Sequence, residues 1–152
     1  VLGDFLSEKS CTSMEYIKQL LQGKFPAAPK FSVMISHVKD IARAHVLSLA
    51  NKRAGGRRLI VGSEVRSILE LSKIMAENLP SHAKKLPKKE LPNFMVKLLS
   101  YIDTSAKNLV PDLGLTMQTD QTYAEEILQM KFLPSETAVV DAAKSVVRLK
   151  LA

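Results

Sequence analysis

The chain has 152 residues, 46% of them hydrophobic, and its 22 lysines and arginines against 15 acidic residues give a net charge of +7. A chain of this length can bury about 70% of its unfolded surface, which predicts one substantial core in a single unit, residues 1–152. No apolar run reaches the ~18 residues of a membrane span, no signal peptide opens the chain, and the lone Cys11 excludes an internal disulfide, so we predict a reducing, cytoplasmic setting.

A capping box predicts the start of the first helix. Thr12 is expected at the N-cap with Glu15 three residues later, so that each side chain bonds to the backbone N–H of the other. Gly23 predicts the end of this helix, because glycine readily takes the left-handed conformation that follows many helices. The residues predicted to face the core are Met14, Ile17, Leu20 and Leu21. Residues 31–35 then read as a short strand.

The stretch from 34 to 50, MISHVKDIARAHVLSLA, places a histidine and an acid between a strand and a helix. The carboxylate of Asp40 is expected to accept from free N–H groups in the first turn and so to cap a helix over 41–50. For His37 three roles are open: a buried ring that satisfies carbonyls of the turn, a substrate contact, or a catalytic base. We predict that both residues serve the turn, with His37 as the partner of Asp40.

The second half of the chain is predicted to be mostly helical. A strand over 59–61 ends at Gly62, and a second capping box, Ser67 with Glu70, opens a helix that Pro80 stops. Three further helices are expected after Pro92, around residue 125 and over 135–149. The helix after Pro92 carries a broad apolar face of Phe94, Met95, Leu98, Leu99 and Ile102. This order predicts a helix-rich α/β fold with too little sheet for a complete doubly wound nucleotide-binding domain.

Motifs of a self-contained enzyme are missing from the sequence. There is no G-x-G-x-x-G turn, no Walker loop, no G-x-S-x-G elbow and no tyrosine with a lysine four residues later. We therefore predict no catalytic residue and no metal site in this chain.

Two basic patches allow two interpretations, solvated loops or nucleic-acid binding. They consist of Lys52, Arg53, Arg57 and Arg58, and of Lys84, Lys85, Lys88 and Lys89. Few aromatic residues are available for base stacking, so we predict no nucleic-acid partner, and equally no membrane partner.

Several stretches, in order, resemble the later part of extended short-chain dehydrogenase/reductases. SHVKDIARAHVLSLA is similar to the family's H-V-x-D-[VI]-A-x-A-H segment, and RRLIVGSEVRSILELSKIM to its R-Y-I-V-x-G-E-x-x-S-x-x-E-I-A. The closing LQMKFLPSETAVVDAAKSVVRL is similar to the family's closing segment. LPNFMVKLLSYID and PDLGL resemble the branch of dihydroflavonol reductase-like and bacterial aldehyde reductase-like enzymes in the epimerase/dehydratase superfamily. The resemblance covers essentially the whole chain and departs from the family at Asp4, which replaces a usual proline, and at Gln129, which replaces a usual glycine.

This resemblance implies the C-terminal, substrate-binding lobe of an NAD(P)-dependent reductase. The chain opens at Val1 without a methionine, so we expect the Rossmann domain, the Gly-rich turn and the Tyr-x-x-x-Lys pair in a longer protein, with the chain alone inactive. The longer protein would reduce an aldehyde or ketone by hydride transfer from the reduced nicotinamide of its cofactor, NADP or NAD. Val1 is expected beside the nicotinamide. The residues expected to line the substrate pocket are Leu2, Gly3, Phe5, Met34 and Ile35.

A stand-alone binding or scaffold module without catalysis is the alternative function. The absent motifs fit both functions, and the sequence does not separate them. Without the nucleotide-binding domain, an apolar face should be exposed, which allows self-association.

Overall fold

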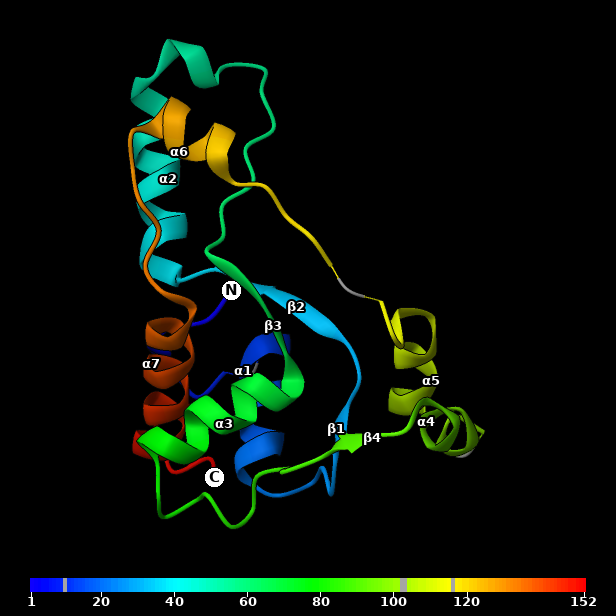
Figure 1. Ribbon diagram of the computed structural model, residues 1–152. Helices are drawn as coiled ribbons and strands as arrows, with labels where there is room; N and C mark the ends of the chain where they lie inside the picture. The colour runs from blue at the N-terminus through cyan, green and yellow to red at the C-terminus, as the bar shows by residue number, and fades with distance from the viewer. Residues whose placement is uncertain (10, 102–103, 116) are drawn as a thin grey trace.

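The computed structural model describes residues 1–9, 11–101, 104–115 and 117–152 (Figure 1). The helices are α1 (Thr12–Leu21), α2 (Val38–Ala50), α3 (Ile68–Asn78), α4 (Asn93–Leu99), α5 (Thr104–Leu109), α6 (Thr122–Leu128) and α7 (Ser135–Arg148), with 3₁₀ turns at Lys52–Ala54 and Val110–Asp112. The strands are β1 (Ala28–Pro29), β2 (Ser32–Ile35), β3 (Glu64–Ser67) and β4 (Glu90–Leu91). Two two-stranded sheets result, antiparallel β2–β3 and parallel β1–β4. The prediction of a helix-rich α/β fold is confirmed.

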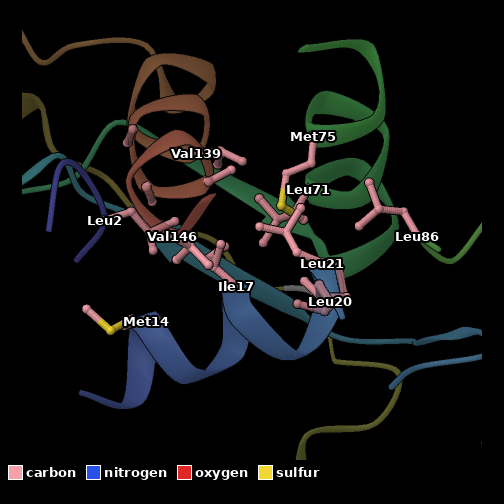
Figure 2. Close-up of a cluster of buried hydrophobic side chains, with 14 of the residues drawn as sticks. Leu2, Met14, Ile17, Leu20, Leu21, Leu71, Met75, Leu86, Val139 and Val146 are labelled. Atoms are coloured by element: carbon pink, nitrogen blue, oxygen red, sulfur yellow. The ribbon is translucent and has the colours of Figure 1, made fainter. Parts of the chain in front are cut away.

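Three helices and one small sheet enclose the main core. Helices α1, α3 and α7 converge beside β2 and β3 (Figures 1 and 2). The largest side chains of this cluster that are almost fully buried are Met14, Ile17, Leu20, Leu21, Ile68, Leu71, Met75, Val139 and Val146. The apolar face predicted for the first helix is therefore the face that packs against α7.

The end of α1 is as predicted and its start is not. Gly23 has a φ of +75°, its N–H donates to the Leu20 carbonyl at 3.0 Å, and the N–H of Lys24 donates to the Gln19 carbonyl at 3.1 Å. These two bonds form a complete Schellman motif. The prediction of Thr12 as N-cap is wrong, because Thr12 is already helical and the carboxylate of Glu15 instead bonds to side chains one turn on, at Lys18 and Gln19.

The second capping box is confirmed. The Ser67 hydroxyl accepts from the N–H of Glu70 at 3.2 Å, and the Glu70 carboxylate accepts from the N–H of Ser67 at 2.7 Å. Helix α3 ends at Asn78, two residues before Pro80, as predicted. Gln129 also behaves as its departure from the family suggested, since it takes the left-handed conformation with φ of 49° after α6.

The strand predicted over 59–61 is wrong. These residues have no strand geometry, and the partner of β2 is the more polar segment that follows, with Val33 opposite Arg66 and Ile35 opposite Glu64. Leu59 and Val61 pack instead against a second, smaller cluster where α2 meets α6 (Figure 1). The buried residues of this cluster are Ala44, Ile127, Leu128 and Met130. Two of the three apolar residues that suggested a strand over 59–61 are thus used in tertiary packing, whereas Ile60 is 40% exposed.

The helix predicted after Pro92 forms, but its apolar face is not in the core. Within α4 only Val96 is buried among the residues whose side chains the structure describes, while Phe94 and Leu98 are exposed by 70% and 68%. Leu99 and Ile102 lie outside those described side chains. Figure 1 shows α4 and α5 to one side of the core helices, joined to them through β4. Residues 104–112 form α5 and a 3₁₀ turn.

Candidate functional site

An apolar hollow of about 340 Å³ lies beside the first residues of the chain, where α1, β2 and α3 meet. It is called the N-terminal hollow below. Its lining contains no charged side chain, and its polar groups are the hydroxyls of Thr12, Ser13 and Tyr16. The other lining residues are Val1, Leu2, Ile17, Phe31, Val33, Met34, Ile35 and Leu71. This lining suits an uncharged, largely apolar molecule.

Backbone hydrogen bonds hold the start of the chain at this hollow. The N–H of Leu2 donates to the Ser36 carbonyl at 2.8 Å, and the N–H of Val38 donates to the Leu2 carbonyl at 2.8 Å. These bonds form a parallel bridge between Leu2 and His37, directly after β2. The strand-like pairing fixes Val1 and Leu2 against Met34 and Ile35, which come from a distant part of the sequence.

The residues predicted for the substrate pocket divide into two groups. Leu2, Met34 and Ile35 line the N-terminal hollow together with Val1, the residue expected beside the nicotinamide. Gly3 and Phe5 do not line it. Gly3 is buried against Val38, and the N–H of Phe5 donates to the Ser145 hydroxyl of α7 at 3.1 Å.

The residues that α1 contributes to the lining of the N-terminal hollow were not anticipated from the sequence. Thr12, Ser13, Tyr16 and Ile17 follow one another at spacings of one, three and one, which places them on one side of a helix. That spacing is a usable signal, but it overlaps with the pattern of the core face. Phe31 and Leu71 carry no local signal that distinguishes a pocket wall from the core.

The prediction that Asp40 caps a helix is wrong. Helix α2 begins at Val38, and its N-cap is His37, whose Nδ1 accepts from the N–H of Lys39 at 3.1 Å. Asp40 therefore lies inside the first turn, where its carboxylate accepts from the N–H of Leu133 at 2.8 Å. Asp40 links α2 to the segment that precedes α7.

His37 is a structural residue with a different partner from the predicted one. Its side chain is fully buried, and because Nδ1 is an acceptor, Nε2 carries the ring proton. Nε2 faces the Asp141 carboxylate of α7 at 3.3 Å. With both nitrogens occupied inside the protein, His37 is not placed to contact a substrate or to act as a base.

The hydroxyl of Tyr16 is buried without a hydrogen-bond partner in the described part of the chain. The ring packs against Phe25 and Phe31, with centroids 5.7 and 6.3 Å away. Burial disfavours the charged phenolate and raises the pKa of Tyr16 well above its usual value. The group is thus a neutral phenol whose hydrogen-bonding capacity is unused.

We expect Tyr16→Phe to stabilise the chain by about 1 kcal/mol, because it removes a buried hydroxyl that is desolvated and unpaired while keeping the ring. The free energy of unfolding in urea measures this change. Tyr101→Phe is the control, since Tyr101 is 86% exposed and its hydroxyl is hydrated, so the same change should have little effect. A loss of stability in Tyr16→Phe would show that the hydroxyl has a favourable partner.

A polar cluster of Glu64, Arg66, Glu70 and Ser135 ties β3 to the starts of α3 and α7. The Arg66 guanidinium donates to Glu64 at 2.8 Å, to the Ser135 hydroxyl at 3.0 Å and to Glu70 at 3.4 Å. The Ser135 hydroxyl in turn donates to Glu64. These bonds favour the charged carboxylates: the hydrogen bond from Ser135, followed by that from Arg66, lowers the pKa of Glu64, and the hydrogen bonds from Ser67 lower the pKa of Glu70.

This cluster predicts a loss of stability in acid. A carboxyl group whose pKa is lower in the folded chain stabilises the fold above its ordinary pKa, about 4.3, and the contribution disappears as the pH falls through the lower, folded value. The urea midpoint should therefore decrease from pH 6 to pH 3, and Glu64→Gln should reduce part of that decrease. Glu77→Gln, at an exposed position of α3, is the control. If the urea midpoint of Glu64→Gln depended on pH as in the unchanged chain, Glu64 would not contribute to the loss of stability in acid.

Neither a metal site nor a complete cofactor site is formed by the described residues. No group of three or more histidine, cysteine, aspartate or glutamate side chains within them is arranged to hold a metal ion. Within the residues that the structure describes, no glycine-rich turn joins a strand to a helix in a way that could bind a pyrophosphate. Val1, the residue expected beside the nicotinamide, is 56% exposed and lies at the N-terminal hollow. No helix of the described ranges is long and apolar enough to cross a membrane.

Comparison with known proteins relates this fold to reductases. No protein-family model matches the chain. Over 82 residues it is 29% identical to tetraketide alpha-pyrone reductase 2 of Arabidopsis thaliana, a match that covers 54% of this chain and 25% of that enzyme. The chain thus matches a minor part of this relative.

Solved structures show the same fold over nearly the whole chain. Gre2 from Candida albicans superposes with a TM-score of 0.70 at 22% identity, covering 98% of this chain and 42% of Gre2. Yeast methylglyoxal/isovaleraldehyde reductase Gre2, complexed with NADPH, gives 0.67 at 19% identity, covering 98% and 44%. The chain therefore has the fold of less than half of such a reductase, as the resemblance to the C-terminal portion of extended short-chain reductases predicts.

Proposed function

We propose that this chain is the substrate-binding portion of an NAD(P)-dependent reductase that reduces the carbonyl group of an aldehyde or ketone. The observation that carries the proposal is the N-terminal hollow, an uncharged cavity built on the residues that open the chain. The similarity of the chain's fold to reductases of known structure supports the same class of reaction. The chain covers less than half of those reductases, so the complete activity belongs to a longer protein.

The role of this chain is to bind and orient a substrate and to exclude water around it. The hollow would take the apolar part of the carbonyl compound, between α1 and β2, with the reacting carbon toward Val1. The lining offers no cation for a phosphate or carboxylate, which favours a neutral aldehyde or ketone over a nucleotide-sugar.

The cofactor would be held outside this chain. NADPH is present in two of the similar Gre2 structures, which supports NADP as the cofactor of the longer protein. NADPH supplies the hydride, and this chain contributes no described group that could bind its pyrophosphate. We propose a cytoplasmic location for the same protein, with which the free, exposed Cys11 agrees.

The test begins with the intact mass and the N-terminal sequence of the protein as its own cell makes it. A product about twice this length, with a glycine-rich turn and a Tyr-x-x-x-Lys motif before Val1 and NADPH-dependent reduction of an aromatic aldehyde, is expected. The 152-residue chain should show neither turnover nor micromolar NADPH binding. A native product that begins at Val1, or micromolar NADPH binding by the chain, would overturn the proposal; the first result would favour a binding module without catalysis.

A further inference from the structure

A second hollow, of about 600 Å³, lies at the foot of α4, away from the N-terminal hollow. It forms where the loop after α1 meets the segment that leads into α4. Its floor is apolar, with Phe25, Leu86 and Met95 among its lining residues. Four lysines complete the lining: Lys84, Lys85, Lys88 and Lys89. We refer to it as the lysine groove.

The lysine groove is strongly positive. All four lysine side chains are exposed, and none of them forms an ion pair within the described part of the chain. Glu90 is the single acidic residue of the lining. The segment 81–109 contains six lysines, two acidic residues and no arginine, so it carries more than half of the chain's net charge of +7. An anionic partner is therefore favoured electrostatically.

Helix α4 adds exposed apolar side chains next to these lysines. Phe94 and Leu98 are exposed by 70% and 68%, and their spacing of four residues places them along one side of α4. Tyr101, just after the end of α4, is exposed by 86%. Met95, which lines the lysine groove, joins the two features and is itself 42% exposed. Single exposed apolar residues are ordinary, but a continuous group of them marks an interaction surface.

The composition of this surface distinguishes between possible partners. Protein interfaces and nucleic-acid sites favour arginine, whose planar group binds carboxylates and phosphates through paired hydrogen bonds, whereas every basic residue here is lysine. A nucleic acid would also leave the apolar side chains of α4 in water. A second copy of the chain would bring the same positive charge, which opposes pairing.

We propose that the lysine groove and the exposed side of α4 form a docking surface for an anionic lipid membrane. Lysines that face acidic headgroups, beside phenylalanine and leucine side chains that enter the interface, are the two components of peripheral membrane binding. The proposal goes beyond the reductase function and replaces the expectation that the chain has no membrane partner. The chain lies on the membrane surface, with the N-terminal hollow left open.

The proposal is tested by sedimentation of the 152-residue chain with vesicles of phosphatidylcholine alone or with phosphatidylserine. Binding is expected only to the vesicles that contain phosphatidylserine, and this binding should weaken as the salt concentration rises. Replacing Lys84, Lys85, Lys88 and Lys89 by glutamine should weaken it about tenfold or more, since each lysine near an anionic surface contributes to affinity. The matched control replaces Lys52, Arg53, Arg57 and Arg58 by glutamine, which removes the same charge elsewhere and should have a much smaller effect.

A second pair of variants tests the apolar part. Leu98→Ser should weaken vesicle binding severalfold, whereas Leu49→Ser, at a 91% exposed position of α2, should not. Equal losses from the two charge variants, or no binding to phosphatidylserine vesicles, would overturn the proposal. Binding to an acidic peptide or to RNA without binding to vesicles would also overturn the proposal, and it would identify a different partner for the lysine groove. Because vesicle binding does not depend on turnover, failure here leaves the proposed reductase function standing.

Discussion

Gly3→Ala should lower the free energy of unfolding by about 3 to 4 kcal/mol, from two costs that act together. Gly3 has a φ of +142°, a conformation that residues with a Cβ atom rarely adopt. A Cβ atom built there would lie 2.6 Å from Cγ1 of Val38. Val38 is β-branched and opens α2, so its side chain has few alternative rotamers. Urea unfolding measures the combined loss.

Gly56→Ala separates the two costs. Gly56 has a φ of +66°, but a Cβ atom there would have no neighbour within 4 Å, so this substitution should cost about 1 kcal/mol from the backbone alone. The double variant Gly3→Ala with Val38→Ala should recover the steric part of the loss and keep the backbone part. If Gly3→Ala and Gly56→Ala cost the same, the close approach of the first residues to α2 is not as tight as the structure shows.

Leu20→Ala is expected to have the other large effect, a loss of about 2 to 5 kcal/mol. Leu20 is fully buried, and its side chain lies in the main core near the end of α1 (Figure 2). The substitution removes apolar contacts and leaves a cavity that the surrounding helices can only partly close. Thermal and urea unfolding both measure the loss.

Leu49→Ala is the matched control for this prediction. It is the same substitution within a helix, at a side chain that is 91% exposed, and alanine and leucine have similar helix propensities. We expect a change below about 0.5 kcal/mol. A large loss at Leu49 would indicate that this exposed end of α2 is covered by a partner or by a second copy.

Local signals in the sequence were sufficient for several features of this fold. The end of α1 at Gly23 and the capping box of Ser67 with Glu70 depend on residues within a few positions of one another, and both are confirmed. The left-handed conformation at Gln129 could also be inferred, because the family to which the chain is similar usually has a glycine there. Backbone geometry of this kind is set by neighbours in the chain.

Features that depend on distant residues could not be predicted. Aspartate is a common residue at helix caps, but the hydrogen-bond partner of Asp40 is the N–H of Leu133, 93 positions later. His37 lies 104 positions from Asp141. The lining of the N-terminal hollow was reached only in part. The resemblance to extended short-chain reductases led to Leu2, Met34 and Ile35, whereas Tyr16 and Leu71 have no sequence feature that separates a cavity wall from the core.

The packing of α7 against α1 and α3 has a consequence for how the chain is synthesised. The backbone of Phe5 bonds to Ser145, 140 positions away, and the main core includes Val139 and Val146. During translation the hydrophobic residues of α1 and α3 emerge long before those that cover them, so the nascent chain cannot complete this core until α7 leaves the ribosome. Contacts between residues so far apart in the sequence slow folding, and apolar surface that stays exposed in the meantime promotes aggregation of the newly made chain.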